Sequence, residues 1–412
     1  MRSCPAALRA AVALGALLGG GCGCLAAQEA PDGEPFVLGR TYTIYSASLG
    51  EDRPVTVALP VGYDPTRAYA VVYVLDGPIH IVHTAGAVHM LAQSHRMPES
   101  IVVAVANTTE RNANMSPPAQ GAPVGDGSVG RADEFKAFFR DELKPWVEAR
   151  YPTNRLDVLI GHSAGGVFVA HVLNTEPELF DGYISIGGSL EYDDGRFVAS
   201  LDDMFERFPG ARASLYLAMA NEGGVMLAAN QHLVRTLEEH APSSFRWRWR
   251  EMPDETHDSA PARATLDGLE WIFEAWNPQD LWSELYDRGV EALPRIEAHF
   301  ARLSRDVGFE VEMPVDRVRM VSRRLELAGR ADRALPIAEA LVERAPEHFM
   351  AQSALAQALE AACRLQEAEA HYREAIRLAR ATGRPTYFVR AIEEYREGVE
   401  DRIRIGGCKG GG

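Results

Sequence analysis

The chain has 412 residues, 46% of them hydrophobic, and its formal net charge is −16. This length exceeds one ordinary domain, so we expect two domains with enough apolar residues for a sizeable core. The acidic balance argues against binding to nucleic acid or to an anionic membrane surface, because both kinds of partner select a basic patch. The sequence therefore predicts no nucleic-acid partner.

The first residues have the pattern of an export signal. Arg2 and Arg9 precede the short apolar stretch "AAVALGALLGGG", and small residues follow it in "CLAAQEA". This stretch is too short to span a bilayer, so it predicts a cleaved signal peptide at 1–27 and a periplasmic or extracellular protein. Lipid attachment at Cys22 or Cys24 is the weaker alternative, because the glycines before Cys22 make a poor lipoprotein signal. We expect no transmembrane segment after the signal.

Residues 34–276 alternate between strand-like and helix-like patterns. The run "YAVVYVLDG", which ends at Gly77, is continuously apolar and β-branched, as in a strand buried on both faces. The predicted strands are 36–48, 53–60, the run ending at Gly77, 100–107, 156–161, 180–188, 213–221 and 245–253. Helices are expected near 84–95, at 130–151 and between the later strands. This alternation predicts an α/β domain with a mostly parallel sheet covered on both faces.

Beyond "NPQD" at 277–280 the pattern is helical, and it repeats. Ala334, Ala338 and Leu341 recur 34 residues later as Ala368, Tyr372 and Ala375. This is the period of tetratricopeptide helix pairs, so we predict an all-α tetratricopeptide-like domain at 281–402. A generic alanine-rich helical hairpin is the alternative. The last residues, 403–412, are predicted to form a flexible tail.

Two cysteines follow the signal segment, Cys363 and Cys408. Two distant cysteines do not make a disulfide scaffold. Cys363 lies in a helical pattern and is predicted to serve packing, and Cys408 in the tail is predicted to be a free thiol. A disulfide between them is the alternative.

Ser163 is the candidate nucleophile, because "LIGHSAGG" has the G-x-S-x-G pattern between a predicted strand and a predicted helix. Strand, sharp turn and helix form the context of a nucleophile elbow. Gly161, His162 and Gly165 complete the motif, and the glycines suit a strained turn with close helix–strand contact. A structural turn in an inactive relative is the alternative interpretation.

A serine needs a base, and in this fold the chain order is serine, acid, histidine. His257 in "MPDETHDSAP" follows the last predicted strand and is the candidate base. The remaining histidines after the elbow in this domain lie in predicted helices and are read as packing or surface residues: His171, His232 and His240.

The candidate acid is Glu222, the first carboxylate after "SLYLAMAN", where it would orient the imidazole. Asp193, Asp194 and Asp254 are alternatives, as is a serine–histidine dyad without an acid.

An oxyanion hole requires two backbone N–H groups. Ala164 is expected to supply one and Gly77 the other. His80 or His83 is expected to face the active-site mouth, and Arg111 is expected near the substrate. The histidines of "HIVHTAGAVHMLAQSH" have no spacing typical of metal ligands, so we predict no metal site.

The chain resembles the Putative esterase family of α/β-hydrolases, which includes enterochelin-type siderophore esterases, feruloyl and acetylxylan esterases, S-formylglutathione hydrolase and mycolyltransferases. The resemblance is carried by "VVYVLDG", "FFRDELKPWVEARYP", "LIGHSAGG" and "DETHDSA". The stretch "IEAHFARLSRDVGFEVEMP" and the helices after it are similar to a bacterial subgroup with a C-terminal tetratricopeptide-like extension. The resemblance implies an α/β-hydrolase fold, no cofactor, and Ser163, His257 and Glu222 as nucleophile, base and acid.

The chain departs from the family pattern at two positions. Pro78 stands where relatives commonly have an N–H group that completes the oxyanion hole, so Gly77 or Ile79 must donate instead. Glu191 stands where the subgroup often has an aromatic residue, which implies a more acidic substrate pocket.

The sequence thus predicts an exported serine esterase acting on a small-molecule ester. One alternative is a hydrolase that has lost catalysis and binds a protein partner through its helical repeats. Another is an acyltransferase that uses the same acyl-enzyme.

Overall fold

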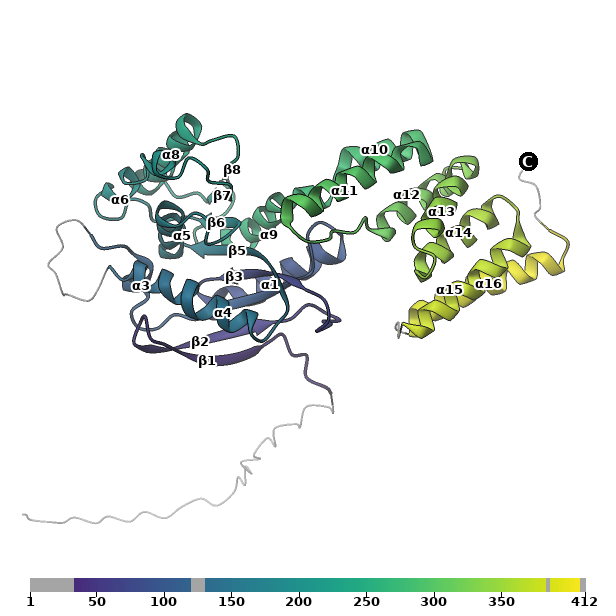
Figure 1. Cartoon of the computed structure of the whole chain (residues 1–412), viewed down its shortest axis with the longest axis horizontal. Helices are drawn as coiled ribbons and strands as arrows, with labels where there is room; N and C mark the ends of the chain where they lie inside the picture. The colour runs from purple at the N-terminus through teal and green to yellow at the C-terminus, as the bar shows by residue number, and fades with distance from the viewer. Residues whose placement is uncertain (1–32, 120–129, 383–385, 408–412) are drawn as a thin grey trace, which may run out of the picture. The chain divides into compact units, whose positions relative to one another are not determined.

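The computed structural model describes residues 33–119, 130–382 and 386–407 (Figure 1). The predicted signal peptide, with Cys22 and Cys24, lies outside the described residues, and so does Cys408. The strands are β1 (Arg40–Ser46), β2 (Glu51–Ala58), β3 (Tyr69–Val74), β4 (Ser100–Val105), β5 (Thr153–His162), β6 (Gly182–Ile186), β7 (Ser214–Met219) and β8 (Arg246–Glu251). The helices of the same part of the chain are α1 (Gly77–Gln93), α2 (Arg111–Met115), α3 (Ala132–Ala137), the π-helical η1 (Phe138–Leu143), α4 (Lys144–Glu148), α5 (Ala164–Thr175), α6 (Arg196–Ala199), α7 (Met204–Arg207), α8 (Gly224–His240), α9 (Ala260–Ile272) and the 3-10 turn η2 (Glu274–Trp276).

The eight strands form one sheet in the order β1-β2-β4-β3-β5-β6-β7-β8. β1, β2 and β4 pair antiparallel, whereas β4, β3, β5, β6, β7 and β8 run parallel to their neighbours. Successive side chains of β3 point to opposite faces: Val72 and Val74 pack with α1 and α9, while Val71 and Tyr73 pack with α3, α5 and α8. Both faces are therefore covered, and the predicted α/β-hydrolase architecture is confirmed (Figure 1).

Two local differences from the sequence prediction have physical causes. The helix expected near 84–95 already begins at Gly77. Pro78 suits the first helical turn, because an N–H at that position would have no acceptor within the helix and its absence loses no hydrogen bond. The helix expected at 130–151 is interrupted by the π-helical segment η1, which buries Phe138, Phe139 and Leu143 against the sheet.

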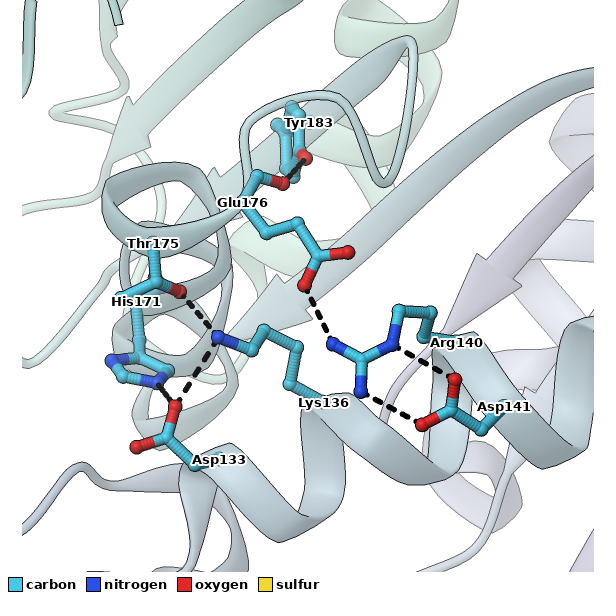
Figure 2. Close-up of polar contacts among 8 residues, drawn as sticks. All are labelled: Asp133, Lys136, Arg140, Asp141, His171, Thr175, Glu176 and Tyr183. Atoms are coloured by element: carbon cyan, nitrogen blue, oxygen red, sulfur yellow. Dashed lines mark hydrogen bonds and ion pairs between the residues drawn. The ribbon is translucent and has the colours of Figure 1, made fainter. Parts of the chain in front are cut away.

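A polar network fastens α5, the helix that follows Ser163, to α3 (Figure 2). His171 Nε2 lies 3.0 Å from Asp133 Oδ1, and Lys136 Nζ lies 3.2 Å from the same oxygen. Lys136 also donates to Thr175 Oγ1 at 2.8 Å. Burial raises the pKa of Asp133, but the hydrogen bonds from His171 and Lys136 more than offset this effect, so its pKa lies below the ordinary value. Burial lowers the pKa of His171.

We expect Asp133→Asn to lower the free energy of unfolding by about 1 kcal/mol at pH 7, because it leaves the buried His171 and Lys136 without their charged acceptor. The difference from wild type should shrink as the pH falls through the lowered pKa of Asp133, since its carboxylate stabilises the folded state only while ionised. Urea unfolding at several pH values measures this. Asp141→Asn is the control, because Asp141 pairs with Arg140 on the exposed surface. An equal loss of unfolding free energy in Asp133→Asn and Asp141→Asn would contradict the stabilising role of Asp133.

The C-terminal region is helical, with α10 (Gln279–Arg288), the 3-10 turn η3 (Gly289–Ala292), α11 (Leu293–Val307), α12 (Val315–Leu327), α13 (Ala331–Arg344), α14 (Phe349–Ala361), α15 (Leu365–Ala381) and α16 (Thr386–Arg404). The α14–α15 pair begins 34 residues after the α12–α13 pair, helix by helix. The repeated positions are buried: Ala334, Ala338, Leu341, Ala368, Tyr372 and Ala375. The two pairs thus repeat with the same spacing, and their tetratricopeptide identity stays a prediction.

Cys363 has a φ of 63° and is disulfide-bonded, which differs from the packing role predicted for it. Among the described residues no helix combines the length and apolarity that crossing a membrane requires. The helix α16 continues to Arg404, so the start of the predicted tail is helical.

Candidate active site

Ser163 lies at a sharp turn between β5 and α5. Its backbone has φ 60° and ψ −117°, a conformation that L-residues rarely adopt, and its N–H donates to the carbonyl of Ile186 at 2.9 Å. A side chain at Gly161 would place Cβ 2.2 Å from the carbonyl oxygen of Gly165, so glycine is required there. The elbow geometry therefore presents Ser163 at the carboxyl edge of the parallel strands.

The sequence predicts close helix–strand contact at Gly161 and Gly165, and the structure adds a further close approach at Gly166. A Cβ on Gly165 would meet Leu75 Cδ1 at 3.3 Å, whereas one on Gly166 would lie 2.6 Å from Gly188 Cα. Because Gly188 is distant in sequence, the motif alone does not reveal this approach.

His257 and Glu222 lie together at the same edge of the sheet. His257 Nδ1 is 2.6 Å from Glu222 Oε1, and the exposed fractions of the two side chains are 32% and 13%. Glu222 follows β7, and His257 lies in the loop between β8 and α9. A Cβ on Gly187, which has φ 50°, would lie 3.0 Å from Glu222 Oε1 and 3.1 Å from His257 Nδ1. The pair thus packs on the residue that follows Ile186, beside the elbow.

The alternative acids are placed differently. Asp193 and Asp194 pair with Arg196 at 3.2 and 3.5 Å. Among the described residues, Glu222 is the carboxylate that His257 contacts, and no hydrogen bond joins the Ser163 hydroxyl to His257. Catalytic hydrogen bonds are often long without substrate and tighten in the complex.

Each of the two expected oxyanion donors is the first residue of a helix. Ala164 is the first residue of α5 and Gly77 is the first residue of α1, where N–H groups have no partner within the helix. Ile79 is less suited, because its N–H already donates to the Asp76 carbonyl at 2.9 Å. A side chain at Gly77 would place Cβ 2.9 Å from the backbone of Ala104, which fixes this position as glycine.

Four imidazoles form a series of neighbouring rings, and His257 is at one end of it. The ring centroids of His162 and His257 are 4.4 Å apart, those of His80 and His162 are 5.5 Å apart, and His80 Nδ1 lies 3.0 Å from His83 Nε2. Burial lowers the pKa of His162 and of His83 to about 4 and also lowers that of His80. These three rings are therefore neutral near pH 7. Within the described residues, no group of His, Cys, Asp and Glu is arranged to hold a metal ion.

The lowered pKa values of these imidazoles predict that the folded protein loses stability in acid. Between pH 6.5 and about 4 the unfolded chain protonates His83 and His162, whereas the folded chain does not. The free energy of unfolding should therefore decrease as the pH decreases through that window. Each imidazole contributes at most about 1.4 kcal/mol per pH unit, and less where it is part-exposed. Urea unfolding of the wild type and of His83→Asn at several pH values measures the effect. The variant should show a shallower slope, and an unchanged slope would contradict the prediction.

The three residues expected near the substrate have different surroundings. His80 is buried, with 6% of its surface exposed. Arg111 donates from Nε and Nη2 to both carboxylate oxygens of Asp76, at 2.6 and 2.8 Å, so its guanidinium is engaged by the protein. Glu191 has a buried Oε2 without a hydrogen-bond partner.

Comparison with known proteins shows similarity to proteins named as esterases. Residues 46–221 match the family model described as "Putative esterase". The chain is 31% identical over 175 residues to the siderophore triacetylfusarinine C esterase of Aspergillus fumigatus, covering 39% of this chain and 56% of that protein. It is 25% identical over 239 residues to the ferri-bacillibactin esterase BesA of Bacillus subtilis, covering 53% and 77% of the two chains. The match thus spans little more than half of the first relative's length.

A solved structure shares the fold. The IroE-like serine hydrolase from Shewanella oneidensis superposes with a TM-score of 0.61 at 24% identity, covering 74% of this chain and 99% of that one. Together with the sheet order and the elbow, these matches agree with the resemblance seen in the sequence. The chain is therefore similar to the Putative esterase family over residues 46–221, and the two relatives compared are named as siderophore esterases.

Proposed function

We propose that the protein is a serine esterase in which Ser163, His257 and Glu222 form the catalytic triad. The observation that carries this proposal is the 2.6 Å contact between Glu222 and His257, beside the serine of a strained elbow. A carboxylate on Nδ1 holds the imidazole so that Nε2 faces the nucleophile as a base, and it stabilises the imidazolium that forms. The match of residues 46–221 to the Putative esterase model supports the same chemistry.

The proposed reaction has two steps. His257 Nε2 takes the proton of Ser163 as Oγ attacks the ester carbonyl, and the resulting oxyanion accepts hydrogen bonds from the N–H groups of Ala164 and Gly77. The imidazolium then protonates the departing alkoxide, which leaves an acyl group on Ser163. In the second step His257 takes a proton from a water as that water attacks the acyl carbonyl, and the imidazolium then returns the proton to Ser163 Oγ as the carboxylic acid leaves. The chain's own groups supply each proton transfer, so the scheme uses no cofactor.

The proposed substrate class is a siderophore-type ester, because the two relatives compared above are named as esterases of siderophores. The unpartnered oxygen of Glu191 supports a substrate with a hydrogen-bond donor or a positive charge near the site.

We also propose that the protein is exported. The signal pattern of the first residues supports this.

An ester panel tests the proposal. Wild type and Ser163→Ala are compared on a cyclic trimeric siderophore ester, a feruloyl ester and p-nitrophenyl esters of increasing chain length. We expect turnover in at least one class, greatest for the siderophore ester, and none above background in the variant. Equal rates in the two proteins would overturn the esterase assignment. Preference for another class would overturn the substrate assignment alone.

A further inference from the structure

The Arg111–Asp76 ion pair, which the sequence does not reveal, adjoins Gly77, one of the two candidate oxyanion donors. The Asp76 carboxylate is 1% exposed and accepts Arg111 Nε at 2.6 Å, Arg111 Nη2 at 2.8 Å and the amide of Asn107. Burial raises the pKa of Asp76, but the bonds from Arg111 and Asn107 lower it by more, so the group stays ionised. Such a two-bond pair fixes the orientation of both partners.

Asp76 controls the direction of the Gly77 N–H. It has φ 53° and ψ 42°, the left-handed region that non-glycine residues rarely occupy. The peptide plane between residues 76 and 77 carries the Gly77 N–H, and the ψ angle of Asp76 sets its rotation. A strained conformation persists only where surrounding contacts hold it. Here the contacts that hold it are those of the Asp76 side chain.

The same ion pair reaches the elbow. Arg111 Nη2 lies 3.4 Å from the carbonyl oxygen of His162, the residue before Ser163. On the other side, a Cβ built on Gly165 would lie 3.7 Å from Asp76 Oδ2. The pair therefore contacts both segments that would supply oxyanion donors, the turn at Gly77 and the start of α5.

We propose that Arg111 is a positioning residue: through Asp76 it holds the Gly77 N–H at the oxyanion site and fixes this turn against the elbow. The inference rests on the proposed esterase function. It replaces the substrate-binding role expected for Arg111, because two guanidinium nitrogens already bond to Asp76.

The test compares Arg111→Ala with wild type in three measurements. We expect kcat to fall about 30-fold with KM nearly unchanged, since a misaligned oxyanion donor weakens transition-state binding and not substrate binding. Affinity for an alkyl boronic acid, which forms a tetrahedral adduct on the serine, should fall by a similar factor. Low-millimolar guanidinium ion should restore part of kcat, because the Arg111 side chain is 30% exposed and its place can be refilled.

Lys144→Ala is the matched control. Lys144 Nζ pairs with the buried Asp157 at 2.8 Å, in the middle of β5 and six residues before Ser163. It should lower thermal stability while leaving kcat and boronate affinity unchanged, and guanidinium should have no effect on its turnover. Should Arg111→Ala fail to fold, Asn107→Ala removes one bond to Asp76 and should show a smaller loss of the same kind.

Three results would overturn the inference: a raised KM with unchanged kcat in Arg111→Ala, a kcat loss without any loss of boronate affinity, or no recovery with guanidinium. Failure of the proposed function is distinguishable, because wild-type turnover would then survive Ser163→Ala.

Discussion

Replacing Ser163 with alanine is expected to lower kcat by about 10⁵-fold, to the level set by substrate binding and the oxyanion donors alone. His257→Ala should cost about as much, and the double variant little more, because the nucleophile and its base act as one unit. Steady-state hydrolysis of p-nitrophenyl acetate measures these rates, with circular dichroism to show that each variant folds. Ser94→Ala is the control, since its hydroxyl only bonds the carbonyls of Met90 and Leu91 at the end of α1. If the kcat losses of Ser163→Ala and His257→Ala instead add up in the double variant, the two residues do not act as one unit.

Glu222→Gln is expected to lower kcat by about 10²-fold or more while the protein keeps its fold. Glutamine preserves the size of the side chain but removes the charge that stabilises the His257 imidazolium, and its amide can favour the wrong tautomer. Kinetics of the purified variant measure the loss.

Asp193→Asn serves as the matched control, because Asp193 pairs with Arg196. A nearly silent Glu222→Gln, with Ser163→Ala and His257→Ala both inactive, would show that the enzyme works as a dyad. A loss confined to Asp193→Asn would move the acid to that residue.

Much of the sheet was predictable, because buried parallel strands are continuous apolar runs that local sequence reveals. The π-helical turn at Phe138 was not, since its apolar spacing is also that of an ordinary helix. The start of α1 at Gly77 was missed although Pro78 signalled a helix start, because the strand pattern of "YAVVYVLDG" extends into the turn.

The candidate site likewise has residues that the sequence reveals and residues that it does not. Chain order and the ends of strands placed Ser163, Glu222 and His257 at one edge without any structure. Gly166 and Gly187 were missed, because each is required by an approach from a distant segment. Arg111 is expected near the substrate from the sequence, whereas its ion-pair partner Asp76 lies 35 residues earlier. Long-range pairing of this kind is not visible in local sequence.

The most direct test of the central claim is peptide mapping after reaction with a fluorophosphonate. We expect one adduct per protein, located on Ser163, with esterase activity lost in proportion to labelling and no adduct in Ser163→Ala. Stoichiometric labelling at another residue, or ester hydrolysis by a protein that remains unlabelled under the same conditions, would contradict the claim.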